Sequence, residues 1–202
     1  NVSFYNQSPD GPVYPTPTIG MVGLLEDVNN KMTLDFKNEG DLIYLIGASQ
    51  NDISSSEYLH KILGVEFSPC PYFDLQEEFE LQQTTAVLIK NKLVQSAHDV
   101  SEGGLWVTIM ESCFNRALGC NVTMQDGFRK DAFWFGEAQS RVVVSVSPAL
   151  EKEFKTAMQK TTVAFSLLGN VIGENIIIAG ENWGSVNEWK LKYDTAIEKE
   201  LS

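Results

Sequence analysis

The stretch that decides the fold is Val94-Gln95-Ser96-Ala97-His98-Asp99-Val100-Ser101-Glu102-Gly103-Gly104, near the middle of the 202-residue chain. Its first four residues predict a short strand, and the glycine-bearing turn leads into a predicted helix. That helix carries an apolar face of Trp106, Ile109, Met110 and Cys113. A strand that passes through a short turn into a helix is a building unit of α/β sheets.

Strand and helix signals alternate on both sides of this stretch. They predict strands at 41–46, 121–124 and 141–146, helices at 74–90 and from Pro148, and a short charged helix from Asp194. Residues 163–172 and 175–179 are predicted to pair as a hairpin around Gly173. The alternation predicts an α/β fold with a helix-covered sheet, and the hairpin makes that sheet mixed rather than purely parallel.

Two helices carry further local signals. The pair Ser54-x-x-Glu57 has the pattern of a capping box, and Gly64 is well placed to end the helix that it would start. In the 74–90 helix, an apolar stripe is predicted along Leu75, Phe79, Gln82, Ala86 and Ile89.

The first thirty residues differ from the rest. Residues 8–18 hold four prolines and predict a stiff loop, and 19–25 predict a buried strand. The polar break at Asn29-Asn30 is the predicted boundary between two domains, 1–28 and 29–202.

Composition excludes several classes of protein. The formal net charge of −12, without a basic patch, argues against nucleic-acid binding, and the apolar runs are too short to cross a membrane. The three cysteines are an odd number without metal-site spacing, which favours reduced thiols in a cytoplasmic protein. Neither a serine–histidine–acid set nor a phosphate-binding P-loop is legible.

The opening stretch is the first candidate site. Asn1, Ser3 and Asn6 alternate with Val2 and Phe4, so a strand here would have one polar face. Such a face suits a phosphate with its magnesium, or it belongs to an edge strand that meets water. Because the chain opens inside a dense polar and aromatic run, we expect it to be part of a longer polypeptide.

Residues 98–104 are the second candidate. Asp99 lies where a strand ends and a helix begins, a place where anions and their magnesium gather. The alternative is a helix cap formed by Asp99 or Ser101, and His98 is expected to be a hydrogen-bonded structural histidine.

Glu137, Gln139 and Arg141 form the third candidate. They alternate before a valine-rich strand and would project to one side. They would contact a polar ligand or form a surface ion pair of little energetic value.

Four segments together resemble motifs of the phosphoribosylformylglycinamidine synthase family, in the right order. They are Asn-Val-Ser-Phe-Tyr-Asn (1–6), Pro-Thr-Pro-Thr-Ile-Gly-Met-Val-Gly (15–23), His-Asp-Val-Ser-Glu-Gly-Gly-Leu (98–105) and Gly-Glu-Ala-Gln-Ser-Arg (136–141). The last two are shared in weaker form with aminoimidazole ribonucleotide synthetase and selenophosphate synthetase. Gln7 stands where the family often has glutamate, so it receives no role.

The resemblance implies a fold and an activity. The fold is the three-layer α/β/α C-terminal domain of the aminoimidazole ribonucleotide synthetase type, partly ferredoxin-like, preceded by a short remnant of an N-terminal-type domain. The parent enzyme would be an ATP-dependent C–N ligase that phosphorylates the formyl oxygen of formylglycinamide ribonucleotide and lets ammonia displace the phosphate. Its partners would be the rest of the synthase subunit and a glutaminase subunit or domain.

The resemblance also implies roles for individual residues. Asn1 would bind magnesium beside ATP, and Ser3 would contact the substrate. Asp99, Glu137, Gln139 and Arg141 would belong to an auxiliary nucleotide site or stabilise the fold, because the catalytic half is absent and no catalytic residue falls in this chain. The alternatives are a structural or nucleotide-binding scaffold and another ATP-dependent ligase of the same superfamily.

Overall fold

The computed structural model describes residues 2–3, 7–9, 11–12 and 17–201. By their contacts these fall into two units, one up to Lys31 and one from Met32. In the first unit, β1 (Val2–Ser3) pairs antiparallel with β4 (Pro17–Thr18), and β2 (Gln7–Ser8) pairs with β3 (Gly11–Pro12). The identity of this unit as the remnant of another domain stays a prediction.

The buried strand predicted at 19–25 is wrong. The segment forms no strand, and its apolar side chains are exposed, Met21 to 93%. A strand needs a pairing partner and an apolar cover, and the described part of the first unit offers this segment neither. A short 3-10 helix, η1 (Val28–Asn30), follows; the Asp27 carboxylate accepts a hydrogen bond from the Asn29 backbone N–H.

The second unit is built on a mixed seven-stranded sheet in the order β11-β10-β7-β9-β5-β8-β6. The strands are β5 (Leu42–Ile46), β6 (Ser96–Asp99), β7 (Gly119–Val122), β8 (Val142–Val146), β9 (Phe165–Ile172), β10 (Asn175–Ile178) and β11 (Glu181–Ser185). Only the pair of β10 with β7 is parallel, and the other neighbours run antiparallel.

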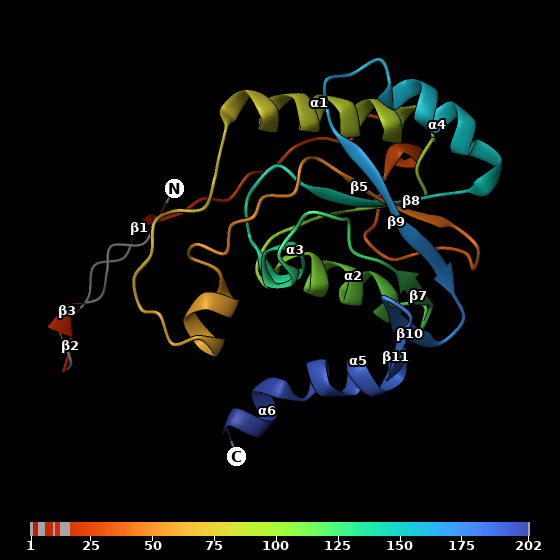
Figure 1. Ribbon diagram of the computed structural model, residues 1–202. Coiled ribbons are helices and arrows are strands. Elements are labelled where there is room, and N and C mark those ends of the chain that lie inside the picture. Colours follow the sequence, from red (N-terminus) through yellow and green to blue (C-terminus); the bar gives the residue numbers. More distant parts are fainter. Residues whose placement is uncertain (1, 4–6, 10, 13–16, 202) are drawn as a thin grey trace. The chain divides into compact units, whose positions relative to one another are not determined.

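Helices cover both faces of the sheet (Figure 1). The helices of the second unit are the π-helix η2 (Tyr58–Ile62), α1 (Leu75–Lys90), α2 (Gly104–Phe114), α3 (Lys130–Phe135), the 3-10 helix η3 (Pro148–Leu150), α4 (Glu151–Met158), α5 (Val186–Asp194) and α6 (Ala196–Leu201). Side chains of α1 and α4 pack on one face, and those of α2, α3 and α5 pack on the other. The predicted three-layer α/β/α architecture with a mixed sheet is therefore confirmed.

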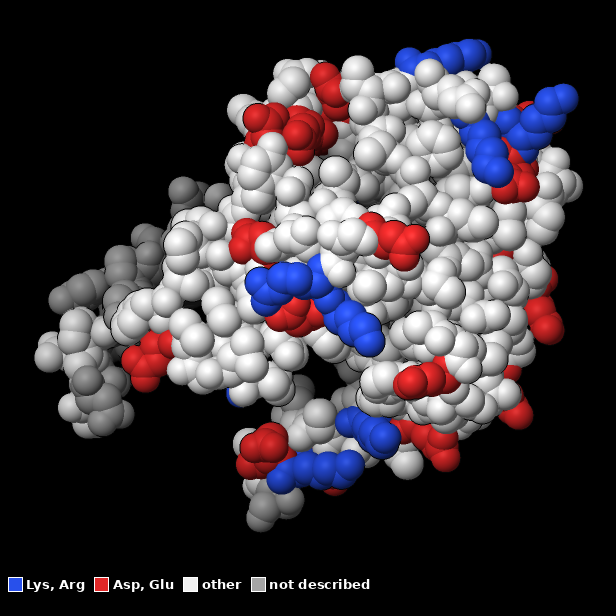
Figure 2. Space-filling view, viewed as in Figure 1, with Lys and Arg blue, Asp and Glu red and all other residues white. Residues whose placement is uncertain are grey.

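The central strand β5 shows how the sequence fills both layers. Tyr44 and Ile46 pack toward α1 and α4, whereas Ile43 and Leu45 pack toward α2 and α3, as the two-residue period of a strand requires. Each fully buried side chain of this size contributes about 1.5–3 kcal/mol. Charged side chains lie in small groups on the outside (Figure 2).

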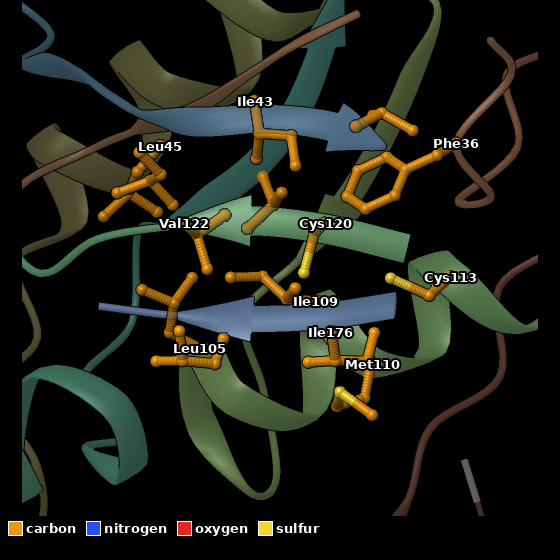
Figure 3. Packing of buried hydrophobic residues seen from close by; sticks show 14 of the residues in the cluster. Phe36, Ile43, Leu45, Leu105, Ile109, Met110, Cys113, Cys120, Val122 and Ile176 are labelled. Carbon is orange, nitrogen blue, oxygen red and sulfur yellow. The ribbon is translucent and has the colours of Figure 1, made fainter. Parts of the chain in front are cut away.

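Two cysteines belong to the core on the α2 side. Cys113 of α2 and Cys120 of β7 are buried, free and directed toward each other (Figure 3). A hydrogen bond with Cys120, together with burial, raises the pKa of the Cys113 thiol. The Cys113 thiol therefore stays neutral, and both side chains act as part of the packed core.

The predicted hairpin of 163–172 with 175–179 is wrong. β7 lies between β9 and β10, so the two strands are not neighbours. The hairpin partner of β10 is β11, joined to it by Ala179 and Gly180, whose φ angles of 52° and 84° fit a type I′ turn. The closeness of β9 and β10 in sequence favoured pairing between them, but in the sheet both strands pair with β7, which is more distant in sequence.

The capping box predicted at Ser54 is also wrong. The helical turn starts later, at η2, and its N-cap residue Glu57 makes no side-chain cap. Ser56 supplies the local hydrogen bond instead, because its Oγ accepts from the Leu59 N–H at 3.1 Å. The backbone N–H of Ser54 is bound by the carboxylate of Asp52 at 2.8 Å.

Candidate functional site

A cavity of about 420 Å³ lies beside the edge strand β6, between α1 and the loop that leads into β8. Asp99 lines it together with Gln139 and Arg141, which lie some forty residues further along the sequence. The antiparallel register places Asp99 opposite Val142, and the Val100 N–H donates to the Arg141 carbonyl at 2.9 Å. The sheet therefore brings the second and third predicted candidates to one site.

Asp99 offers a free carboxylate to this cavity. It ends β6 and is exposed, and its side chain makes no hydrogen bond or ion pair with the described residues. The N-cap residue of α2 is Gly103, in the left-handed conformation at φ 80°, and no side chain caps the helix from that position. The alternative that Asp99 or Ser101 serves as the cap of α2 is therefore wrong.

Glu137 has a structural role at the start of α2. Its Oε1 accepts hydrogen bonds from the backbone N–H groups of Gly103 and Glu57, both at 2.9 Å. A carboxylate is favoured at a helix N-terminus because the unpaired N–H groups there carry partial positive charge. Glu137 thus fastens the loop before β8 to α2 and to the segment that enters η2.

Arg141 is buried at 2% exposure and holds the same loop from inside. Its Nε donates to the Ala138 carbonyl at 3.1 Å and its Nη2 to the Gly136 carbonyl at 2.6 Å. Burial lowers the pKa of Arg141 to about 10, against the opposing effect of the Glu137 carboxylate. The guanidinium therefore stays protonated at neutral pH and supplies positive charge to the cavity wall.

Gln139 and Ser140 form the exposed part of the loop. Gln139 is exposed, and its Nε2 donates to the Glu137 carbonyl at 3.4 Å. Ser140 adopts φ 62°, and its Oγ donates to Oε2 of Glu78 on α1 at 2.8 Å. The loop is thereby tied to the helix that forms the opposite wall.

Helix α1 corrects the predicted apolar stripe. The side chains buried against the sheet are Leu81, Thr84 and Leu88, whereas Leu75 is 73% exposed. Three stripe residues line the cavity instead: Gln82, Ala86 and Ile89. Two faces of the helix carry apolar side chains, and the face with Leu81 and Leu88 packs on the sheet.

Thr85 and Glu78 are cavity residues that the sequence did not reveal. The Thr85 Oγ1 atom is buried and has no hydrogen-bond partner in the described part of the chain. A buried hydroxyl without a partner is costly, so a polar ligand atom at this wall would be stabilised. In the sequence, the one indication that this face of α1 lines a cavity was the polar Gln82 inside an otherwise apolar stripe.

His98 is held as a structural histidine. Its Nδ1 lies 3.1 Å from the Thr108 carbonyl and 3.2 Å from the Ser112 Oγ, and its Nε2 lies 3.4 Å from the Glu111 carboxylate. All three partners belong to α2, so the ring fixes that helix to β6.

The first candidate site is described only in part. Asn1 lies outside the described residues, and Ser3 is placed as a backbone position of β1 opposite Pro17. The roles of Asn1 and Ser3 stay predictions.

The residues of the Asp99 cavity could bind Mg²⁺ only if a ligand with phosphate groups supplied the remaining oxygen atoms. Across residues 2–3, 7–9, 11–12 and 17–201, no three His, Cys, Asp or Glu side chains gather into a metal site. Mg²⁺, however, is commonly bound by one or two carboxylates plus the phosphates of its ligand. The unpaired carboxylate of Asp99 meets that requirement.

A match to a protein family gives the class of the protein. The family described as "AIR synthase related protein, C-terminal domain" matches residues 38–180. The chain therefore belongs to that family.

Its relatives share one name. "Phosphoribosylformylglycinamidine synthase subunit PurL" of Alkaliphilus metalliredigens is 37% identical over 198 residues, covering 94% of this chain and 27% of the relative. The protein of the same name from Salinibacter ruber is 44% identical over 154 residues, covering 73% and 20%. The chain thus spans about a quarter of the length of the curated relatives that it matches.

Solved structures share the fold. "T. maritima PurL complexed with FGAR" superposes with a TM-score of 0.68 at 17% identity, covering 80% of this chain and 29% of that one. "T. maritima PurL complexed with ATP" and "Structure of PurLQS from Thermotoga maritima" both reach 0.60 at 16% identity, covering 77% and 79% of this chain and 26% and 27% of theirs. Among the described residues, no helix has the length and apolar character needed to span a bilayer.

Proposed function

We propose that this chain is the C-terminal part of a phosphoribosylformylglycinamidine synthase. The parent would be an ATP-dependent C–N ligase of purine biosynthesis that converts formylglycinamide ribonucleotide to the amidine. The observation that carries this proposal is the 37% identity to a PurL subunit over 94% of the chain. Because about three quarters of such a subunit lie outside this chain, we expect the isolated chain to be inactive.

The Asp99 cavity would be an auxiliary nucleotide site of that enzyme. Asp99 would hold Mg²⁺ together with the ligand's phosphates, and the protonated Arg141 would add positive charge to the wall. Gln139 and the unpaired Thr85 hydroxyl would hydrogen-bond the ligand. Support for a nucleotide comes from the similar T. maritima PurL structure, which was solved in complex with ATP.

The first unit and the partners complete the proposal. Asn1 would bind Mg²⁺ beside ATP, and Ser3 would contact the ribonucleotide substrate, in a site shared with the rest of the subunit. The similar PurLQS structure from Thermotoga maritima supports assembly with further subunits, and a glutaminase subunit or domain would supply ammonia. The whole would act in the cytoplasm.

Calorimetric titration of the purified chain with ATP, with and without MgCl₂, tests the cavity. We expect magnesium-dependent binding that Asp99→Asn weakens by about tenfold or more, corresponding to about 1.4 kcal/mol. Asp126→Asn is the matched control, because Asp126 is exposed and outside the cavity. Equal affinity in the wild type and Asp99→Asn would refute the role of Asp99.

Assays of the parent reaction test the rest. The chain alone should not turn over formylglycinamide ribonucleotide, whereas a full subunit that ends in this chain should do so with ATP and ammonia. In that subunit Asn1→Ala should mainly impair ATP use, and Ser3→Ala should mainly raise the KM of the ribonucleotide. A full subunit that folds and binds ATP without this reaction would favour the scaffold or another ligase of the superfamily.

A further inference from the structure

A second cavity, of about 270 Å³, has walls made largely of aromatic rings. Trp106 of α2, Trp134 and Phe135 of α3 and Trp183 of β11 line it, with Met124 and Ile178. It shares no lining residue with the Asp99 cavity. The molecular surface is hollowed between the region of α3 and that of α5 and α6 (Figure 2).

The aromatic wall is preformed by ring contacts. The Trp106 ring lies 5.2 Å from that of Trp183 and 6.4 Å from that of Phe135, at tilted angles. Trp189 of α5 supports both tryptophans: its ring packs edge-on against Trp106 at 5.6 Å, and its Nε1 donates to the Trp183 carbonyl at 2.8 Å. A wall that is rigid before binding reduces the entropy that a ligand must lose.

Trp183 presents part of its ring to solvent at this cavity. The residue is 46% exposed and lines the cavity. Its ring is therefore available for stacking at the mouth of the cavity.

Two opposite charges accompany the rings. Lys130 and Glu181 line the same cavity, both are exposed, and neither forms an ion pair or a side-chain hydrogen bond with another described residue. The neighbouring Arg129, by contrast, is paired with Asp131. A donor and an acceptor thus stand unpaired beside an aromatic wall.

We propose that this cavity binds a planar, amino-substituted aromatic heterocycle of nucleobase size. The flat ring would stack on the half-exposed Trp183 and meet the tilted Trp106 ring with its edge, Lys130 would donate to a ring nitrogen, and Glu181 would accept from the exocyclic amine. The volume lies just below the range of about 300–1,000 Å³ usual for ligand pockets, so a base fits better than a larger molecule.

Other ligand classes match the cavity less well. An organic cation would gain from the rings but would meet the Lys130 ammonium. An aliphatic chain would contact the rings but could form a hydrogen bond with neither Lys130 nor Glu181. The heterocycle uses the rings and both charges together.

Titration of the purified chain into 2-aminopurine riboside tests this, because stacking on aromatic rings quenches the emission of that probe. We expect saturable quenching. Trp183→Ala should raise the Kd about tenfold or more, the effect of losing one stacking platform. Lys130→Gln and Glu181→Gln should each weaken binding several-fold, whereas the matched control Lys152→Gln, on α4, should not.

Further arms make each outcome decisive. A circular-dichroism melt verifies folding of every variant, and Trp183→Leu keeps an apolar cover if Trp183→Ala fails to fold. Asp99→Asn should leave the quenching unchanged, which separates this cavity from the proposed nucleotide site. Absence of quenching at millimolar probe, equal Kd in the Trp183 variants, or full competition by tetramethylammonium would overturn the proposal.

Discussion

Replacing Glu137 separates a structural role from a ligand-binding role at this position. The carboxylate accepts two backbone hydrogen bonds, from Gly103 and Glu57. Each hydrogen bond to an ionised group contributes about 1.5–3 kcal/mol. The two bonds together would contribute about 3–6 kcal/mol, but Glu137 is partly exposed and solvent weakens them, so we expect Glu137→Ala to lower the free energy of unfolding by about 2–4 kcal/mol.

Urea unfolding followed by tryptophan fluorescence measures this loss, since every tryptophan lies in the second unit. Glu137→Gln keeps an oxygen acceptor and loses only the charge, so it should cost about 1 kcal/mol. Gln139→Ala, on the same loop but without a bond to either amide, is the matched control and should stay within about 0.5 kcal/mol. Glu137→Ala with unchanged stability but impaired ATP binding would refute the structural role.

Three other changes test separate features. Gly47→Ala should destabilise the chain by about 3 kcal/mol or more in urea, because φ is 97° and a Cβ would lie 2.0 Å from the Ser140 carbonyl oxygen; a normal midpoint would contradict this. Burial disfavours the charge of Asp35, but hydrogen bonds, first from Arg116, hold its pKa well below the usual range. The stability that this adds is fully present above the unfolded pKa of about 4 and is lost progressively as pH falls from there through the much lower folded pKa. Asp35→Asn should therefore destabilise the chain more at pH 7 than at pH 2; an equal difference in melts at both pH values would argue against this. Phe67 is 85% exposed, so we expect the chain to self-associate and Phe67→Ser to reduce this self-association, as measured by light scattering at increasing concentration. A wild-type chain that stays monomeric at every concentration would contradict this prediction.

The sequence was most informative where local pattern and sheet position agree. Strands at 41–46 and 141–146 appear as β5 and β8, because apolar runs of this length can be satisfied only inside a covered sheet. Helix α1 begins after its N-cap Asp74, whose carboxylate accepts from Gln76 and Glu77, and its location needed no tertiary information. The layers and the mixed sheet followed from such elements.

Which strands pair, and which helix face packs on the sheet, depend on contacts between residues that are distant in sequence. The placement of β7 between β9 and β10 is a choice among strands distant in sequence, and β11 was missed because Ala179-Gly180 lacks the usual Asn-Gly signal. Helix α3 is only six residues long, too short for a periodic pattern to show.

For the candidate site, the sequence predicted which residues are present, and the fold determined the role of each. Asp99, Gln139 and Arg141 were recognisable as polar residues at strand ends, and the antiparallel register of β6 with β8 brings them to one cavity. Their roles then separate through partners that only the fold supplies. Glu137 is bound by two backbone amides and Arg141 by two carbonyls, whereas the carboxylate of Asp99 has no partner among the described residues. A polar side chain whose bonds are already satisfied holds the wall in place, and one left unsatisfied beside a cavity is available to a ligand. On that argument Asp99 is the residue of this set whose conservative replacement should change binding without changing the fold.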